Sequence, residues 1–176
     1  TNINLGASLA LKNKKVLMLD IDPQGNTTSG IGISKKDLPY TTYDLLIEEN
    51  FDTKKAILHT SIENLDIIPA SVDLAGAEIE MVAIDGREAR LKKAIEKVIH
   101  DYDYIFIDCP PSLGLLTINS LTAVGSVLIP IQCEFYALEG VSQLVSTIEL
   151  VKKSLNPKLE IEGVILSMFD GRTNLS

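Results

Sequence analysis

Apolar residues follow two spacings along the chain, and each spacing predicts one kind of element. The uninterrupted apolar runs VLML at 16–19 and IFI at 105–107 predict buried parallel strands. Apolar residues that recur every three or four positions, as at Leu91, Ile95 and Val98, predict helices. The expected strands cover residues 16–21, 64–69, 104–108, 126–131 and 161–168. The expected helices cover residues 2–12, 41–47, a segment after Ala70, 89–100 and 138–154.

The order of these elements predicts the fold class. Strands alternate with helices, and the connections between them are short. This alternation is typical of an α/β protein with a doubly wound, mostly parallel sheet. In such a sheet the carboxyl ends of the strands meet at one edge, where ligands bind.

Two of the predicted strands end in carboxylates. Asp20 and Asp22 close the strand at 16–21, and Asp108 closes the strand at 104–108. Mg²⁺ keeps part of its hydration shell and needs few protein carboxylates, so an acid at the end of a buried strand is a typical magnesium anchor in nucleotidases. The pattern therefore indicates phosphate and metal chemistry at the sheet edge.

Both acidic strand ends lead into turns. Pro23, Gln24 and Gly25 follow the first, and Pro110 and Pro111 follow the second. Each proline ring fixes φ and removes a backbone donor, which predicts a stiff, switch-like segment. Glycine supplies a turn geometry that other residues adopt with difficulty.

Composition limits the class of protein further. The 176 residues are 45% hydrophobic, enough to build a core, and no apolar run is long enough to span a membrane. Two cysteines are too few for a disulfide scaffold. A net charge of −8 argues against a chain whose whole surface coats nucleic acid, although a local basic patch remains compatible with it.

Five segments together resemble one known family. They are DIDPQGNTTSGIGI, LDIIPASVDLAGAEIE, YDYIFIDCPPSLGLLTINSL, VLIPIQCEFYALEG and EGVILSMFDGRTNL. In this order they resemble the ParA/Soj family of partitioning ATPases, which are P-loop nucleotidases related to MinD. The similarity covers nearly the whole chain without a large insertion.

The sequence departs from the family pattern at its start. The family's phosphate loop, written KGGVGKT, precedes a helix that begins like the one at Thr1, and this chain contains no such loop. We therefore expect residues 1–176 to form a single partial ATPase domain that lacks the N-terminal P-loop strand and a C-terminal portion. In the family the strand that carries the phosphate loop lies between two strands that match residues 104–108 and 126–131 here. The strands at 104–108 and 126–131 are therefore not expected to pair directly with each other.

The resemblance implies roles for individual residues. Asp22 matches the aspartate that positions and activates the attacking water, and Asp108 matches the aspartate that holds Mg²⁺, through a water. Asp20 either joins the nucleotide site or caps a neighbouring turn. The other residues that match the nucleotide-binding or switch segments are Pro23, Gln24, Gly25, Pro110 and Pro111. Asp170 and Arg172 match the region that contacts the base.

The resemblance also implies a function. It indicates an ATPase that uses Mg²⁺ and ATP, binds DNA non-specifically as an ATP-bound homodimer, and hydrolyses ATP when a ParB-type partner stimulates it. Such a protein partitions chromosome or plasmid DNA and is cytoplasmic and nucleoid-associated. Two alternatives remain: a MinD-like ATPase that positions membrane or protein cargo, and a non-enzymatic fragment that binds partners. Residues 1–176 alone, without the phosphate loop, are expected to be inactive.

Overall fold

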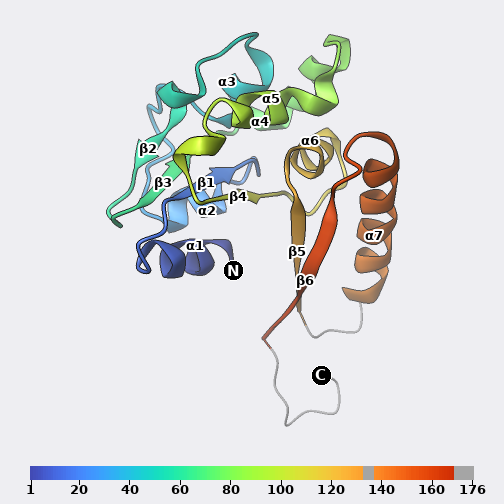
Figure 1. Ribbon diagram of the computed structural model, residues 1–176. Helices are drawn as coiled ribbons and strands as arrows, with labels where there is room; N and C mark the ends of the chain where they lie inside the picture. The colour runs from blue at the N-terminus through green and yellow to red at the C-terminus, as the bar shows by residue number, and fades with distance from the viewer. Residues whose placement is uncertain (133–136, 169–176) are drawn as a thin grey trace. The chain divides into compact units, whose positions relative to one another are not determined.

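Strand β1 (Val16–Asp20) consists of five residues with buried side chains and lies at the centre of a four-stranded sheet. The computed structural model describes residues 1–132 and 137–168, which fall into two units, Thr1–Ser120 and Leu121–Ser176 (Figure 1). In the first unit the strand order is β2-β3-β1-β4. The predicted α/β class with a mostly parallel sheet is confirmed.

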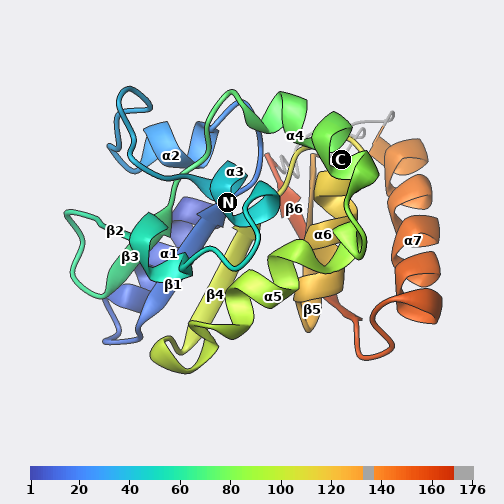
Figure 2. The same cartoon turned by 90° about the horizontal axis from the view of Figure 1, so that it is seen from above.

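The register of the first sheet aligns its strand ends. β3 (Leu65–Ile68) and β4 (Tyr104–Asp108) run parallel to β1 on its two sides, as Figure 2 shows from above. The two-residue strand β2 (Leu58–His59) pairs antiparallel with β3. The carboxyl ends of β1, β3 and β4 therefore meet at the same edge.

Helices cover both faces of this sheet. Figure 1 shows α1 on one side and α3, α4 and α5 on the other. The α-helices that lie wholly in this unit are α1 (Asn2–Ala10), α2 (Asn26–Gly30), α3 (Thr42–Ile47), α4 (Leu74–Glu80) and α5 (Arg90–Glu96). The short 3-10 helices are η1 (Thr53–Ala56), η2 (Met81–Ala83), η3 (Arg87–Ala89) and η4 (Ile99–Asp101).

The second unit contains two parallel strands and a long helix. β5 (Ser126–Gln132) pairs with β6 (Glu160–Ser167), and α7 (Ala137–Ser154) connects them in sequence. Helix α6 (Leu115–Ala123) crosses the boundary between the units. β4 and β5 belong to different sheets, as expected for strands that do not pair directly. The position of a further strand between them stays a prediction.

Most predicted elements form within a few residues of the expected bounds, but several differences stand out. The helix expected at 89–100 ends at Glu96, because the amides of Lys97 and Val98 bond three residues back, to Ala94 and Ile95, and so tighten the turn. The helices α2 and α6 and the short strand β2 were not predicted from the periodicity.

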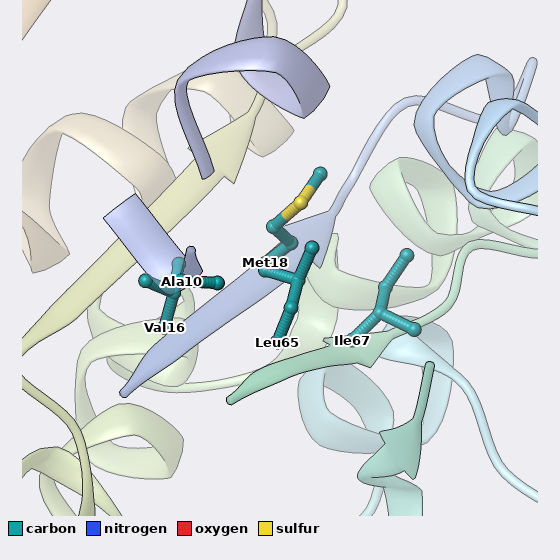
Figure 3. Packing of buried hydrophobic residues seen from close by; sticks show 5 residues of the cluster. All are labelled: Ala10, Val16, Met18, Leu65 and Ile67. Atoms are coloured by element: carbon teal, nitrogen blue, oxygen red, sulfur yellow. The ribbon is translucent and has the colours of Figure 1, made fainter. Parts of the chain in front are cut away.

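Alternate residues of β1 and β3 build the core on one face. Val16 and Met18 lie beside Leu65 and Ile67, and Ala10 of α1 packs over them (Figure 3). Helix α1 approaches closely at Gly6, where an added Cβ would lie 3.1 Å from Met18 Sδ. Because side chains alternate along a strand, one helix can cover this entire face.

Removing the Met18 side chain tests this packing. Met18→Ala leaves a cavity under α1, and we expect the free energy of unfolding to fall by about 2–5 kcal/mol. Leu11→Ala is the control, because Leu11 is 79% exposed and its truncation should change stability by less than about 0.5 kcal/mol. Urea unfolding measures both, and equal effects of the two substitutions would contradict the packing described.

Asp66 of β3 connects neighbouring parts of the first sheet through two polar contacts. His59 Nδ1 lies 2.7 Å from Asp66 Oδ1, and the Tyr102 hydroxyl donates to Asp66 Oδ2 at 2.7 Å. The hydrogen bond with Asp66, followed by the attraction of its charge, raises the pKa of His59. Protonated His59 therefore stabilises the folded state.

This link gives stability a pH dependence of known sign. Because the pKa of His59 is higher in the folded state, its contribution is complete below the unfolded value of about 6.5 and is lost as the pH rises through the folded value. The effect is small, since the His59 side chain is 89% exposed. In urea unfolding at about pH 6 and about pH 8, His59→Gln should lose less stability on the pH increase than the wild type does. An equal loss of stability in the wild type and in His59→Gln would show that the contact between His59 and Asp66 contributes nothing.

Candidate functional site

Two aspartates lie side by side at the carboxyl ends of neighbouring strands. Asp20 ends β1 and Asp108 ends β4, and the two residues are partners in the parallel register. The register thus brings together two acids that are 88 positions apart in the sequence. The convergence expected from the two acidic strand ends is observed.

The Asp20 carboxylate is fully buried and holds the first turn of α2. Its Oδ2 accepts hydrogen bonds from the Thr28 amide at 2.8 Å and the Thr28 hydroxyl at 2.7 Å. The Ala70 amide in turn donates to Thr28 Oγ1 at 3.0 Å. Asp20 therefore has the turn-capping contacts that the sequence left as one of two alternatives.

Burial and a neighbouring charge act together on Asp20. Loss of solvent raises the pKa of this carboxyl, and the negative charge of Asp108 raises it further. The hydrogen bonds from Thr28 and from the Asp22 amide act in the opposite direction. A positive charge nearby would favour the ionised form of Asp20.

Asp22 lies in the turn that follows the strand, because β1 ends at Asp20. The Asp22 amide donates to Asp20 Oδ1 at 3.3 Å, and Asp22 Oδ1 accepts from the Gln24 amide at 2.9 Å. Gly25 then takes a left-handed conformation with φ of 60°, which other residues adopt at a cost. This turn fixes Asp22 relative to the buried Asp20.

Lys35 contacts the same turn from its other side. Its Nζ donates to the Gln24 carbonyl oxygen at 2.7 Å. A Cβ added at Gly25 would lie 2.8 Å from Lys35 Cδ, so the aliphatic part of the lysine also approaches the backbone there. The turn that carries Asp22 is therefore held both by Asp20 and by Lys35.

Asp22 lines a cleft of about 270 Å³ within the first unit. Both proline-containing turns contribute to its walls, together with residues of α4 and α6. The lining residues are Asp22, Pro23, Gln24, Leu74, Ala75, Glu78, Pro110, Pro111, Ser112 and Leu116. The structure thus brings five of the predicted site residues to one cleft, while Asp20, Gly25 and Asp108 support the turns and strand ends beside it.

Five polar residues at this site, Lys35 among them, were not predicted from the sequence. Thr27 Oγ1 donates to Asp108 Oδ2 at 2.6 Å, so Thr27 and Thr28 together connect α2 to both aspartates. Glu78 Oε1 accepts from the Leu116 amide at 3.1 Å, and Ser112 lines the cleft. The adjacent threonines directly after the DIDPQGN turn were the available signal, since hydroxyl residues are typical of a helix start.

Asp170 and Arg172, which the resemblance assigned to base contact, lie outside the described residues. Within residues 1–132 and 137–168, no group of three or more histidine, cysteine, aspartate or glutamate side chains is arranged to hold a metal ion. No helix in the part of the chain that the structure describes is long and apolar enough to cross a membrane.

Comparison with known sequences identifies close relatives. A family model described as an AAA domain matches residues 1–161. The chain is 61% identical to the sporulation initiation inhibitor protein Soj of Bacillus subtilis, over 99% of this chain and 69% of that protein. It is 52% identical to the chromosome partitioning protein ParA of Myxococcus xanthus, over 100% of this chain and 62% of that protein. The chain thus spans roughly two thirds of the length of these relatives.

Solved structures of related proteins also match this chain. A crystal structure of cobyrinic acid a,c-diamide synthase from Mycobacterium smegmatis, with a bound ATP analog and magnesium, is 40% identical with a TM-score of 0.92, over 98% of this chain and 70% of that one. A plasmid partition protein from Borrelia burgdorferi is 29% identical with a TM-score of 0.78, over 97% of this chain and 72% of that one. By its sequence identity with Soj and ParA and its match to the AAA domain model, the chain belongs to the ParA/Soj family of P-loop partitioning ATPases.

Proposed function

We propose that this protein is a ParA-type ATPase that partitions chromosome or plasmid DNA. The observation that carries the proposal is the shared cleft, to which the DIDPQGN turn and the DCPPS turn both contribute at the carboxyl ends of parallel strands. Identity with Soj, at 61%, exceeds identity with the cobyrinic acid a,c-diamide synthase structure, at 40%. The comparison therefore favours partitioning over amide synthesis.

The residues at the strand ends fit magnesium and ATP as the cofactor and substrate. Asp20 and Asp108 are adjacent acids, one of them fully buried, and their mutual repulsion would be relieved by a divalent cation. Asp108 is the residue that would hold Mg²⁺, through a water. When bound, the ion neutralises negative charge that develops on the phosphate oxygens. Thr27 keeps the Asp108 carboxylate oriented through its 2.6 Å hydrogen bond.

Asp22 is the residue that we assign to the attacking water. Its carboxylate lines the cleft and sits on a turn fixed by Asp20 and Lys35. Phosphoryl transfer depends mainly on placing the nucleophile and stabilising charge, so a carboxylate in a fixed position can orient a water without large rearrangement. Pro110 and Pro111 give the opposite wall a restricted backbone.

The partners of the whole protein belong to the same proposal. We infer that it acts in the cytoplasm, associated with the nucleoid, as an ATP-bound homodimer that binds DNA non-specifically. A ParB-type protein would stimulate hydrolysis. Residues 1–176 carry a net charge of −8, so any contact of this part of the protein with DNA has to come from a local basic surface.

Substitution of Asp22 tests the assignment of the water. In the full-length protein we expect Asp22→Ala to lower kcat at least about 100-fold, because a positioned carboxylate acts in the transition state. The dissociation constant for ATP should change less than about threefold, since the carboxylate adds little to ground-state binding. Asp85→Ala is the control, because Asp85 is exposed and does not line the cleft. Near-normal hydrolysis by Asp22→Ala would exclude this role for Asp22.

Residues 1–176 by themselves provide a second test. They contain no glycine-rich loop ending in Lys-Ser or Lys-Thr, so the backbone cradle for the phosphates and its lysine are absent from this sequence. We expect no measurable ATP hydrolysis and a dissociation constant weaker than roughly 1 mM. Isothermal titration calorimetry measures the affinity, and micromolar binding of ATP would contradict the expectation.

A further inference from the structure

We propose that the outer face of α4 and η2 is a docking surface for a basic, amphipathic helix of a protein partner. Four apolar residues form this face, and we call them the α4 stripe: Val72, Ala75, Ile79 and Val82. Val72 is 72% exposed, Ile79 78% and Val82 63%. Large apolar side chains gathered on one exposed face are typical of an interaction site.

The spacing of the α4 stripe matches the surface that another helix recognises. Residues 74–83 form one helical run, in which η2 continues α4 directly, and Val72 lies in the turn just before it, where its carbonyl oxygen accepts the Ala75 amide. Intervals of three, four and three residues place the four side chains within one narrow arc of the helix. Leu74, Ala77 and Met81 occupy the opposite, buried face. The helix is therefore apolar on two faces, and only one of them is covered in the described unit.

The charges around the α4 stripe indicate the chemistry of the occupant. Residues 71–86 contain four acids and no lysine or arginine. The next residue, Arg87, donates to the Val82 carbonyl oxygen and pairs with Glu88, so the cation at this end of the stripe already has an acidic partner. At 100° per residue, Asp73 and Glu80 flank the stripe on one side and Glu78 flanks it on the other. An apolar strip between acidic borders is complementary to a helix with apolar anchors between lysines and arginines.

The same charges argue against a second copy of this chain on the stripe. In a symmetric dimer each copy presents the same patch, so the acidic borders of one copy would face those of the other. Like charges brought together at an interface are destabilising. A basic partner gains attraction at the positions where a second copy would meet repulsion.

The α4 stripe adjoins the Asp22 cleft. Ala75 belongs to both, and Leu74 and Glu78 of the same helix line the cleft with Asp22. Glu78 also accepts the Leu116 amide, which connects α4 to the start of α6 after the proline turn. A partner on the stripe is therefore placed beside the catalytic turn. This coupling to hydrolysis rests on the proposed function, whereas the docking surface itself does not.

Binding of a synthetic helix to the full-length protein tests the surface. The probe is a fluorescein-labelled peptide of about 18 residues, with leucines at the same three-four-three spacing and lysines on both flanks. We expect Ile79→Ser/Val82→Ser to weaken binding at least about tenfold in fluorescence anisotropy. Leu11→Ser is the control, because Leu11, the C-cap of α1, is likewise an apolar residue that is 79% exposed, and this variant should bind the peptide normally.

A second pair of substitutions tests the charges without changing the apolar surface. Asp73→Asn/Glu80→Gln keeps the side-chain shapes and leaves an amide oxygen that can accept the Tyr43 hydroxyl, which donates to Glu80 at 2.8 Å. We expect this variant to bind the peptide several-fold more weakly and to lose part of the salt dependence of binding. Full affinity in both double variants would overturn the proposal. A change in self-association, seen by sedimentation of the Ile79→Ser/Val82→Ser variant, would also overturn it, because a second copy would then cover the stripe.

Hydrolysis measurements separate this inference from the proposed function. Basal ATP hydrolysis should be unchanged in Ile79→Ser/Val82→Ser, because neither residue lines the cleft, while stimulation by the ParB-type partner should be lost. Normal stimulation of this variant would overturn the coupling. Absence of hydrolysis in the wild-type protein would refute the proposed function alone, since peptide binding is measured independently of it.

Discussion

Burial of the Asp20 carboxylate at the end of β1 is the constraint that orders the site. A buried charge is costly unless hydrogen bonds and charges around it compensate, and Asp20 receives three hydrogen bonds from backbone and hydroxyl donors. These bonds require α2 to begin where it does and the chain to turn sharply at Asp22. The position of the proposed catalytic carboxylate is therefore a consequence of how its buried neighbour is satisfied.

That arrangement depends in turn on the covering of β1. All five of its side chains are buried, so helices have to cover both faces of the strand. On one face, Gly6 allows α1 to lie close enough for Met18 to fill the space beneath it. Since Asp20 is two residues beyond Met18, the close packing of α1 limits movement of the strand end that carries the acid.

Sequence alone predicted the parts of this structure whose signal is local. β1 and β4 were expected almost residue for residue, because an apolar run followed by aspartate and proline marks both the strand and its end. α2 was missed, since Thr, Ser and Gly are weak helix formers and this helix is held by its contacts with Asp20 and Asp108. The role of Thr28 depends on tertiary contact with Asp20 and Ala70, which no spacing along the chain reveals.

In helix α4 the spacing of apolar residues predicted the buried face but could not predict that a second apolar face is exposed. Leu74, Ala77 and Met81 were sufficient to predict a helix with one buried face, and the structure confirms that face. The same segment contains a second apolar series, the α4 stripe, whose exposure could only be seen once the fold had fixed which face meets the core. Because the helix also carries Glu78 and Ala75 into the Asp22 cleft, one short element has its buried face in the core, an edge in the cleft and its remaining apolar face in solvent. A helix placed in this way can transmit the presence of a partner on its outer face to the cleft through a small rigid shift, without any rearrangement of the sheet.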